Sequence, residues 1–180
     1  MASLYTESHY ENALMELFEN TLGYECVCGY HIDHNVKSPL YDEVLEESIF
    51  RINKGKPYDA IQNALLTLRN FENGTLIQKN AVFTDYLQNG ISARYTENGE
   101  ERSTLIYLID WENIENNSFI CANQWTFIEN SNRRPDILLF INGLPLVLIE
   151  LKSPSREDTD ASEGYTQIRN YMHEIPSMFY

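Results

Sequence analysis

Three charged residues directly border apolar runs in one stretch of this 180-residue sequence. The stretch RPDILLFINGLPLVLIELK occupies residues 134–152 and carries Asp136, Glu150 and Lys152 beside two aliphatic runs. Burial of a carboxylate is strongly unfavourable unless the group is hydrogen-bonded, paired with a cation or bound to a metal ion. Two carboxylates and an ammonium among aliphatic residues therefore indicate a site that holds a cation.

The distance between the two carboxylates depends on how the apolar runs pair. If residues 142–143 form a two-residue hairpin turn, Asp136 and Glu150 fall on opposite faces of the sheet. A loop with an odd residue count, such as 142–144, instead places Asp136 opposite Glu150, with Cβ atoms about 5 Å apart. We predict the odd offset, because it gathers the charges where one ion can satisfy them. Pro145 has no N–H and fits a strand edge or a bulge there.

Two carboxylates at this separation, with the backbone carbonyl of Leu151, suit a hard cation such as Mg²⁺ or Mn²⁺. Such an ion polarises a phosphoryl oxygen and lowers the pKa of a bound water. Lys152 lies two residues after Glu150, points the same way, and would orient that water or stabilise negative charge in the transition state. The set describes phosphodiester hydrolysis. The structural alternative is an ion pair between Lys152 and Glu150 at an exposed strand end, with Asp136 capping a turn.

The elements that must position these residues can be predicted from the spacing of apolar residues. Helices are expected over about 8–22, 42–53, 57–71 and 75–90, with a short strand at 24–29. From residue 91 onward, β-rich segments alternate with Asn, Gly and Glu turns, and a last helix from about 160 to 175 ends at Pro176. The strand at 144–152 is apolar on both faces, so we expect it to be central in the sheet.

This order predicts a single α/β (α+β) domain over residues 1–180. A helical part (about 8–90) would precede a β-rich catalytic core (about 91–175), with a mixed, largely antiparallel central sheet flanked by helices. The hydrophobic content of 43% is typical of a globular protein. No apolar run is long enough to span a membrane, and no secretory signal or cysteine framework is present. A cytoplasmic location is therefore expected, without a membrane partner.

The net charge of −14 argues against a protein that binds nucleic acid over its whole surface. Lys and Arg neutralise phosphate in such proteins, and this chain carries 13 of them against 27 acidic residues. Contact with DNA would then be local, assisted by a metal ion, or supplied by an attached part.

The longer string RPDILLFINGLPLVLIELKSPS (134–155) closely resembles the nuclease core at the N-terminal end of the restriction (motor) subunit of type I restriction–modification enzymes. These enzymes belong to the PD-(D/E)XK superfamily and have a restriction-endonuclease-like core. SEGYTQIRNYMHEIPSMF (162–179) resembles the helix that follows, with its Q-x-x-x-Y signature, and NNSFICANQWTFI (116–128) resembles the preceding strand. The resemblance covers most of the chain.

The resemblance implies roles for five residues. Asp136 and Glu150 would be the metal ligands and Lys152 the catalytic lysine. Gln167 and Tyr171, which share one helix face, would position DNA or the ligating carboxylates. Tyr171 also lies beside an apolar stripe of its helix, so burial of its ring is the alternative account of that residue.

Three further residues each allow a functional and a structural interpretation. Superfamily members often add an acidic residue from the first helix, and Glu11 is the first choice here, with Glu7 second, as a further metal ligand. Glu11 is equally explained as the capping-box partner of Ser8. Arg133 and Arg134 directly precede the Pro-Asp motif, where they either contact DNA phosphate or are solvated surface residues.

The resemblance implies a metal-dependent endonuclease domain of a type I restriction enzyme. It would cleave unmodified double-stranded DNA after ATP-driven translocation, in a complex with methyltransferase and specificity subunits. The sequence contains no Walker A motif, so ATP would act only through motor domains outside this chain. Two alternatives are an autonomous nuclease of the same superfamily and a catalytically degenerate docking or DNA-binding module.

Overall fold

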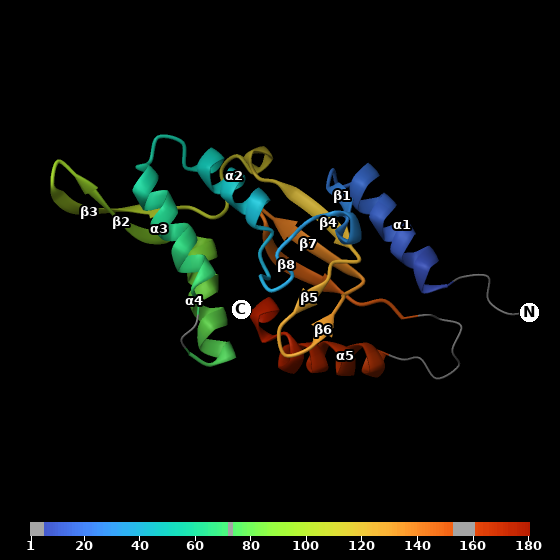
Figure 1. Ribbon diagram of the computed structural model, residues 1–180. Coiled ribbons are helices and arrows are strands. Elements are labelled where there is room, and N and C mark those ends of the chain that lie inside the picture. The colour runs from blue at the N-terminus through green and yellow to red at the C-terminus, as the bar shows by residue number, and fades with distance from the viewer. Residues whose placement is uncertain (1–5, 72–73, 153–160) are drawn as a thin grey trace, which may run out of the picture.

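The computed structural model describes residues 6–71, 74–152 and 161–180. The helices of this part are α1 (Glu7–Asn20), α2 (Asp42–Ile52), α3 (Tyr58–Arg69), α4 (Leu76–Asn89) and α5 (Ala161–Glu174). The strands are β1 (Glu25–Cys28), β2 (Ile91–Glu97), β3 (Glu100–Ile106), β4 (Phe119–Asn123), β5 (Phe127–Ile128), β6 (Asn132–Arg133), β7 (Ile137–Ile141) and β8 (Leu144–Ile149). Four helices and one short strand come first, the remaining strands follow, and α5 comes after them (Figure 1).

Four strands form the central sheet in the order β1-β4-β7-β8. β1 runs parallel to β4, whereas β4–β7 and β7–β8 are antiparallel. Two separate antiparallel pairs, β2–β3 and β5–β6, complete the β structure of the described residues. Figure 1 shows the β2–β3 pair projecting away from the central sheet. The fold is therefore α/β, with a mixed and mostly antiparallel central sheet flanked by helices, as predicted.

The position of β8 differs from the prediction. This strand lies at the edge of the sheet, and the two inner strands are β4 and β7, so the expectation of a central strand at 144–152 is wrong. Apolar residues occur on both faces of β8 because both faces of the whole sheet are covered. Leu146 and Ile149 each pack against a different hydrophobic cluster. Val147, by contrast, is 46% exposed.

A β-bulge determines the register between β7 and β8. The turn is the two-residue segment 142–143, so the expected loop with an odd residue count is wrong. Next to this turn, Phe140 lies opposite Pro145. Further along, however, Leu139 lies opposite Val147, so β8 contains one extra residue. The bulge produces the odd offset that was predicted, and it lies beside the proline that cannot donate a ladder hydrogen bond.

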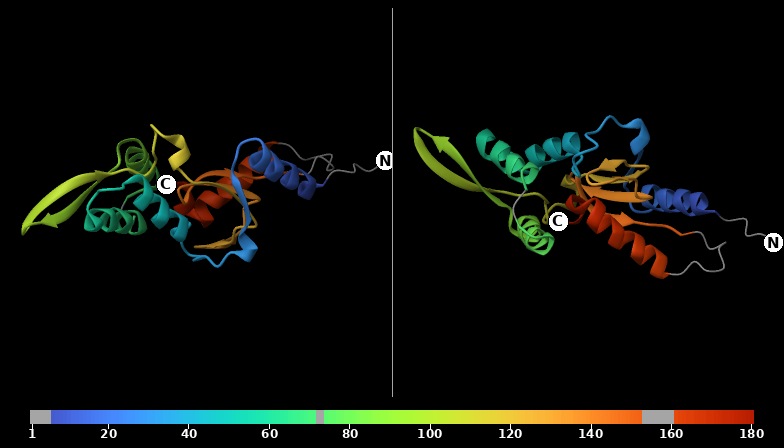
Figure 2. Two further views of the ribbon diagram at one scale, coloured as in Figure 1. Left: turned by 90° about the horizontal axis from the view of Figure 1, so that it is seen from above. Right: turned by 60° about the horizontal axis from the view of Figure 1, so that its bottom comes forward.

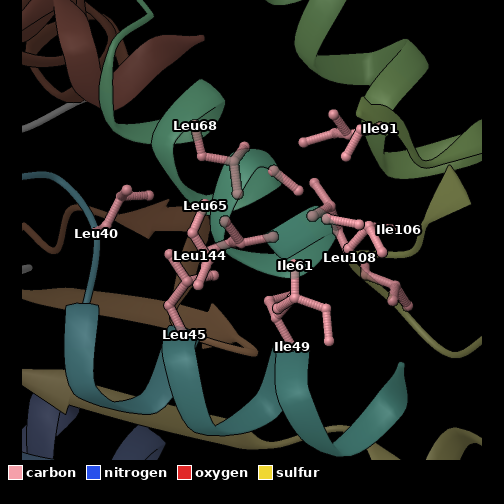
Figure 3. Close-up of a cluster of buried hydrophobic side chains, with 14 residues drawn as sticks. Leu40, Leu45, Ile49, Ile61, Leu65, Leu68, Ile91, Ile106, Leu108 and Leu144 are labelled. Carbon is pink, nitrogen blue, oxygen red and sulfur yellow. The ribbon is translucent and has the colours of Figure 1, made fainter. Parts of the chain in front are cut away.

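The largest hydrophobic cluster lies between α2, α3 and the base of the β2–β3 pair. Leu45 and Ile49 of α2 are fully buried, as are Leu65 of α3 and Ile106 of β3. Figure 3 shows these side chains converging from the helices and strands, together with Leu144 at the start of β8. The spacing of four residues on each helix places the apolar side chains on one face, as the sequence predicts.

Helices α1 and α5 cover opposite faces of the central sheet (Figures 1 and 2). Leu14 and Phe18 of α1 pack against the buried cluster that contains Ile137 of β7, whereas Leu17 of the same helix is 46% exposed. On the other face, Tyr171 of α5 belongs to a buried cluster that contacts β8. No helix within the described ranges has the length and apolar character needed to cross a membrane.

Candidate active site

The first carboxylate of the site is held by the chain that follows β8. Asp136 comes directly before β7, and its Oδ2 accepts a 2.6 Å hydrogen bond from the backbone N–H of Leu151. Because Ile137 pairs with Ile149 beyond the bulge, the same offset places Asp136 and Glu150 at opposing positions. The predicted register at the charged end of the two strands is therefore confirmed.

The second carboxylate is almost completely enclosed. The side chain of Glu150 is 5% exposed, whereas that of Lys152 is 26% exposed. Oε1 of Glu150 accepts hydrogen bonds from Lys152 Nζ, at 3.1 Å, and from Gln167 Nε2. Oε2 accepts a 3.3 Å hydrogen bond from the hydroxyl of Tyr171. The buried charge is thus offset by one ammonium and two neutral donors.

The amide of Gln167 closes this arrangement into a network. Its Oε1 accepts a 2.5 Å hydrogen bond from Lys152 Nζ. Its Nε2 donates to Glu150 and also, at 2.9 Å, to the hydroxyl of Tyr171. The four-residue spacing on α5 puts the glutamine and the tyrosine on one helix face. The ring of Tyr171 is buried, and its hydroxyl bonds to Glu150.

The surroundings raise the pKa of both carboxyl groups. Burial is the main cause for Glu150, and the charge of Asp136 adds to it, while Lys152 acts in the opposite direction. Burial is also the main cause for Asp136; the Leu151 N–H opposes the shift, and the charge of Glu11 adds to it. Burial likewise raises the pKa of Tyr171, which keeps its hydroxyl protonated as a donor.

Glu11 lies on α1 and contacts the end of β4. Its Oε1 accepts hydrogen bonds from Asn123 Nδ2, at 2.7 Å, and from Gln124 Nε2, at 3.2 Å. The predicted capping box of Ser8 and Glu11 is wrong, because α1 begins earlier. A 2.8 Å hydrogen bond joins Thr6 Oγ1 to His9 Nδ1 at the start of the helix instead.

The two arginines before the Pro-Asp motif lie in different environments. Arg133 of β6 makes a two-pronged ion pair with Glu174 of α5, which joins the chain leading into Asp136 to the helix that carries Gln167. The pair borders an open pocket of about 410 Å³ beside that helix. The side chain of Arg134 is exposed.

Comparison with known proteins identifies the family. The sequence model of the family Type I restriction enzyme R protein N terminus (HSDR_N) matches residues 4–180. The chain belongs to this family. It is 34% identical over 142 residues to the type I restriction enzyme HindI endonuclease subunit of Haemophilus influenzae, covering 78% of this chain and 14% of that protein. It is 31% identical over 179 residues to the putative type I restriction enzyme MjaIXP endonuclease subunit of Methanocaldococcus jannaschii.

This second match covers 94% of the chain and 17% of the relative. The chain thus spans less than a fifth of the length of either relative. Membership of the R protein N-terminus family confirms the resemblance that the sequence suggested, and it places the chain in the N-terminal region of such an endonuclease subunit.

The donor set of this R protein N terminus fits a hard divalent cation. Asp136 and Glu150 supply carboxylate oxygens whose burial and mutual repulsion a cation would offset. Within residues 6–71, 74–152 and 161–180, no group of three or more His, Cys, Asp or Glu side chains is placed to hold a metal ion. Mg²⁺ suits such a site, because it keeps several waters and is usually bound through one or two carboxylates.

Three residues of this region were not anticipated from the sequence. Asn123 and Gln124 contact Glu11, and Glu174 contacts Arg133. A signal for the first two exists in the stretch FICANQWTFI, where two adjacent amides interrupt an apolar strand. The partnership of Glu174 depends on the approach of α5 to β6, for which the sequence gives no indication.

Proposed function

We propose that this chain is the metal-dependent endonuclease domain of a type I restriction enzyme, which hydrolyses phosphodiester bonds of unmodified duplex DNA. One observation carries the proposal above all others. Glu150 is a buried carboxylate at a position opposite Asp136, and it is held by a lysine two residues away. Such a pair of desolvated acids with an adjacent ammonium is typical of a catalytic site and is costly as a purely structural element.

The residues that would hold Mg²⁺ or Mn²⁺ are Asp136, Glu150 and the backbone carbonyl of Leu151. When bound, such an ion polarises a phosphoryl oxygen and activates an attacking water. The hydrogen bond from the Leu151 N–H to Asp136 Oδ2 fixes the orientation of that carboxylate. Its other oxygen, Oδ1, is then the atom available to bind the ion. Glu11, whose charge acts on Asp136, is the further acidic residue of the site.

Lys152 would stabilise the negative charge that develops on the phosphoryl group. An ammonium has three N–H donors, and the described partners of Lys152 use two of them, on Glu150 and Gln167. The third N–H is available to a phosphate oxygen, and the side chain is more exposed than the glutamate behind it. A donor already oriented in this way stabilises a transition state without further reorganisation.

Gln167 and Tyr171 act on the reaction through Glu150. Each donates a hydrogen bond to its carboxylate, one to each oxygen. The ring of Tyr171 packs with Phe127 and Ile175 in a buried cluster, so its hydroxyl is held rigidly. Such partners keep a metal-ligating carboxylate in one orientation.

The rest of the restriction enzyme would supply what this part lacks. The relatives are several times longer than the chain, and the net charge of −14 disfavours a strong general grip on DNA. We propose that ATP-driven motor domains outside this chain deliver double-stranded DNA to the site. Methyltransferase and specificity subunits would restrict cleavage to unmodified DNA. Of the two arginines before the Pro-Asp motif, the exposed Arg134 is available to contact a DNA phosphate. Arg133 is already paired with Glu174, so it would contact phosphate only while it keeps this acidic neighbour.

The proposal is tested by metal titration and by cleavage in the complete enzyme. We expect the chain to bind Mn²⁺ in a calorimetric titration, and we expect Asp136→Ala to lose both this binding and DNA cleavage by the assembled enzyme. A matched control is Glu16→Gln, which removes an exposed carboxylate from α1. If the unmodified chain gives no heat of Mn²⁺ binding and the Asp136→Ala enzyme cleaves DNA fully, the chain is a docking module instead. Cleavage by this chain alone without ATP would indicate an autonomous nuclease.

A further inference from the structure

A clamp of two side-chain amides holds Glu11 against the central sheet. Asn123 and Gln124 both donate to the same carboxylate oxygen, Oε1, at 2.7 and 3.2 Å. No donor within the described ranges bonds to the second oxygen, Oε2. Two donors on one oxygen fix the orientation of the carboxylate and leave the other oxygen available to a ligand.

The clamp lies next to the candidate metal site. Asn123 is the last residue of β4 and pairs with Ile137, the residue directly after Asp136. The clamp therefore carries the α1 carboxylate to the strand end at which Asp136 sits. The charge of Glu11 contributes to the raised pKa of Asp136, which agrees with this placement.

Two features indicate that the clamp has a purpose beyond attaching α1. Gln124 has a φ of 53°, a left-handed conformation that residues other than glycine rarely adopt. Such a conformation persists where the surrounding structure determines it, and it is common at functional sites. In addition, Asn123 Oδ1 is buried and has no hydrogen-bond partner in the described part of the chain. An unsatisfied buried acceptor is rare and calls for an explanation, such as a bound ion or water.

We propose that Asn123 and Gln124 are positioning residues of the metal site, which hold Glu11 as an outer carboxylate that binds water of the ion's hydration shell. This inference rests on the function proposed above. Mg²⁺ keeps several of its waters in protein sites, and groups beyond the direct ligands orient them. Glu11 Oε2 is the acceptor for one such water. A role beyond the direct ligands also agrees with the lack of a three-carboxylate cage among the described residues.

The test is Mn²⁺ binding by the 180-residue chain, measured by isothermal titration calorimetry. Asn123→Leu removes both polar atoms of the amide with little change in volume. We expect it to raise the dissociation constant for Mn²⁺ by about tenfold or more, as for other residues that orient metal ligands. Glu11→Gln should cause a similar loss. The double variant should be no weaker than the single ones, because both changes remove the same interaction.

Two controls separate positioning from a purely structural role. Glu16→Gln, on the exposed side of the same helix, should bind Mn²⁺ like the unmodified chain. Without metal, Glu11→Gln should melt at the same temperature as the unmodified chain or higher, since it removes a negative charge near Asp136. A merely structural contact would instead lower the melting temperature and leave the metal affinity unchanged. If Asn123→Leu fails to fold, Gln124→Leu removes the other donor and should weaken binding severalfold.

Each of the following results would overturn the inference. If Asn123→Leu or Gln124→Leu folds and binds Mn²⁺ normally, the clamp does not position the site. If the fold losses of Mn²⁺ affinity caused by Glu11→Gln and by Asn123→Leu multiply in the double variant, the two residues act independently. Loss of binding in Asp136→Ala, with normal binding in the clamp variants, would reject this inference but not the proposed function. If the unmodified chain binds no Mn²⁺, both fail together.

Discussion

Leu151 donates its backbone N–H to Asp136 across 2.6 Å, and this bond extends the contact between β7 and β8 beyond their last ladder pair. It fixes one carboxylate of the site with the residue that directly follows the other. Leu151 also carries the backbone carbonyl that is the expected metal ligand, and Lys152 follows it directly. A substitution that displaces Leu151 should therefore change the positions of both carboxylates and of the carbonyl.

The first prediction concerns the charge of Asp136. Asp136→Asn keeps the shape of the side chain and removes the charge that burial destabilises. Without metal, we expect the free energy of unfolding to stay equal or to rise by less than about 1 kcal/mol, because the desolvated charge is gone. Mn²⁺ binding should be lost, and cleavage by the complete enzyme should fall at least about 100-fold. Calorimetry, thermal melting and a plasmid cleavage assay check the three parts. A strong loss of stability in the metal-free form would contradict the account of the site.

The second prediction concerns pH. The folded-state pKa values of Asp136 and Glu150 lie above their ordinary values, so folding disfavours the ionised forms. Their contribution to stability is fully present below the ordinary carboxyl pKa and is lost as the pH rises through the raised values. Without metal, the melting temperature should therefore fall over this range more steeply than in an Asp136→Asn, Glu150→Gln double variant. A parallel pH dependence of the two proteins would contradict the prediction.

The third prediction follows from the competition between protons and metal at the same two groups. Ligands must be deprotonated to bind a cation, so Mn²⁺ affinity should increase as the pH rises through the raised pKa values of Asp136 and Glu150. Binding should also release protons, which titrations in buffers of different ionisation enthalpy can measure. Proton uptake on binding, or an affinity independent of pH in this range, would count against these residues as ligands.

The fourth prediction separates metal binding from chemistry. Lys152→Met removes the ammonium that contacts Glu150 but leaves both carboxylates in place. The loss of positive charge beside the ligands should leave Mn²⁺ affinity unchanged or improved, whereas cleavage by the complete enzyme should fall on the order of 100-fold. Lys54→Met, at an exposed position of the helical part, is the matched control and should change neither property. Normal cleavage by Lys152→Met would exclude the lysine from catalysis.

The sequence was sufficient to predict the charged cluster but not the β-bulge that aligns its two carboxylates. The unfavourable burial of Asp136 and Glu150 predicts that they lie opposite each other, and the structure agrees. The bulge that achieves this offset depends on packing around β8, and the local pattern near Pro145 is compatible with a longer loop as well. Hydrophobicity on both faces of β8 shows that the sheet is covered, but not that the strand is central.

The roles of the first helix were harder to predict for a related physical reason. A capping box is a local pattern, and both Ser8 and Thr6 provide a hydroxyl before acidic or polar residues of the first turn. Only the full helix shows that Thr6 is the N-cap and that Glu11 faces β4. The contact of Glu11 with Asn123 joins residues that are 112 positions apart. Such a contact depends on tertiary packing, which local spacing does not encode.

The last prediction tests whether the turn before β8 holds the site in register. Gly143 has a φ of 78°, and a Cβ atom there would lie 2.5 Å from the backbone nitrogen of Leu45 and 2.6 Å from the carbonyl oxygen of Tyr41. Gly143→Ala must therefore displace the start of α2 or the turn itself, and we expect a loss of more than about 2 kcal/mol in the free energy of unfolding. Gly99→Ala is the matched control: its φ is 82°, but a Cβ atom would meet nothing within 4 Å.

The control should lose only about 1 kcal/mol, the cost of the left-handed conformation by itself. Urea unfolding measures both changes, and the difference between them isolates the steric conflict at Gly143. Because Gly143 lies in the turn that precedes the bulge, a displaced turn should also disturb the alignment of Asp136 with Glu150. The variant should then bind Mn²⁺ more weakly even under conditions where it is fully folded. Equal losses of stability in the two variants, with unchanged metal affinity, would show that the register of β8 is maintained without the turn.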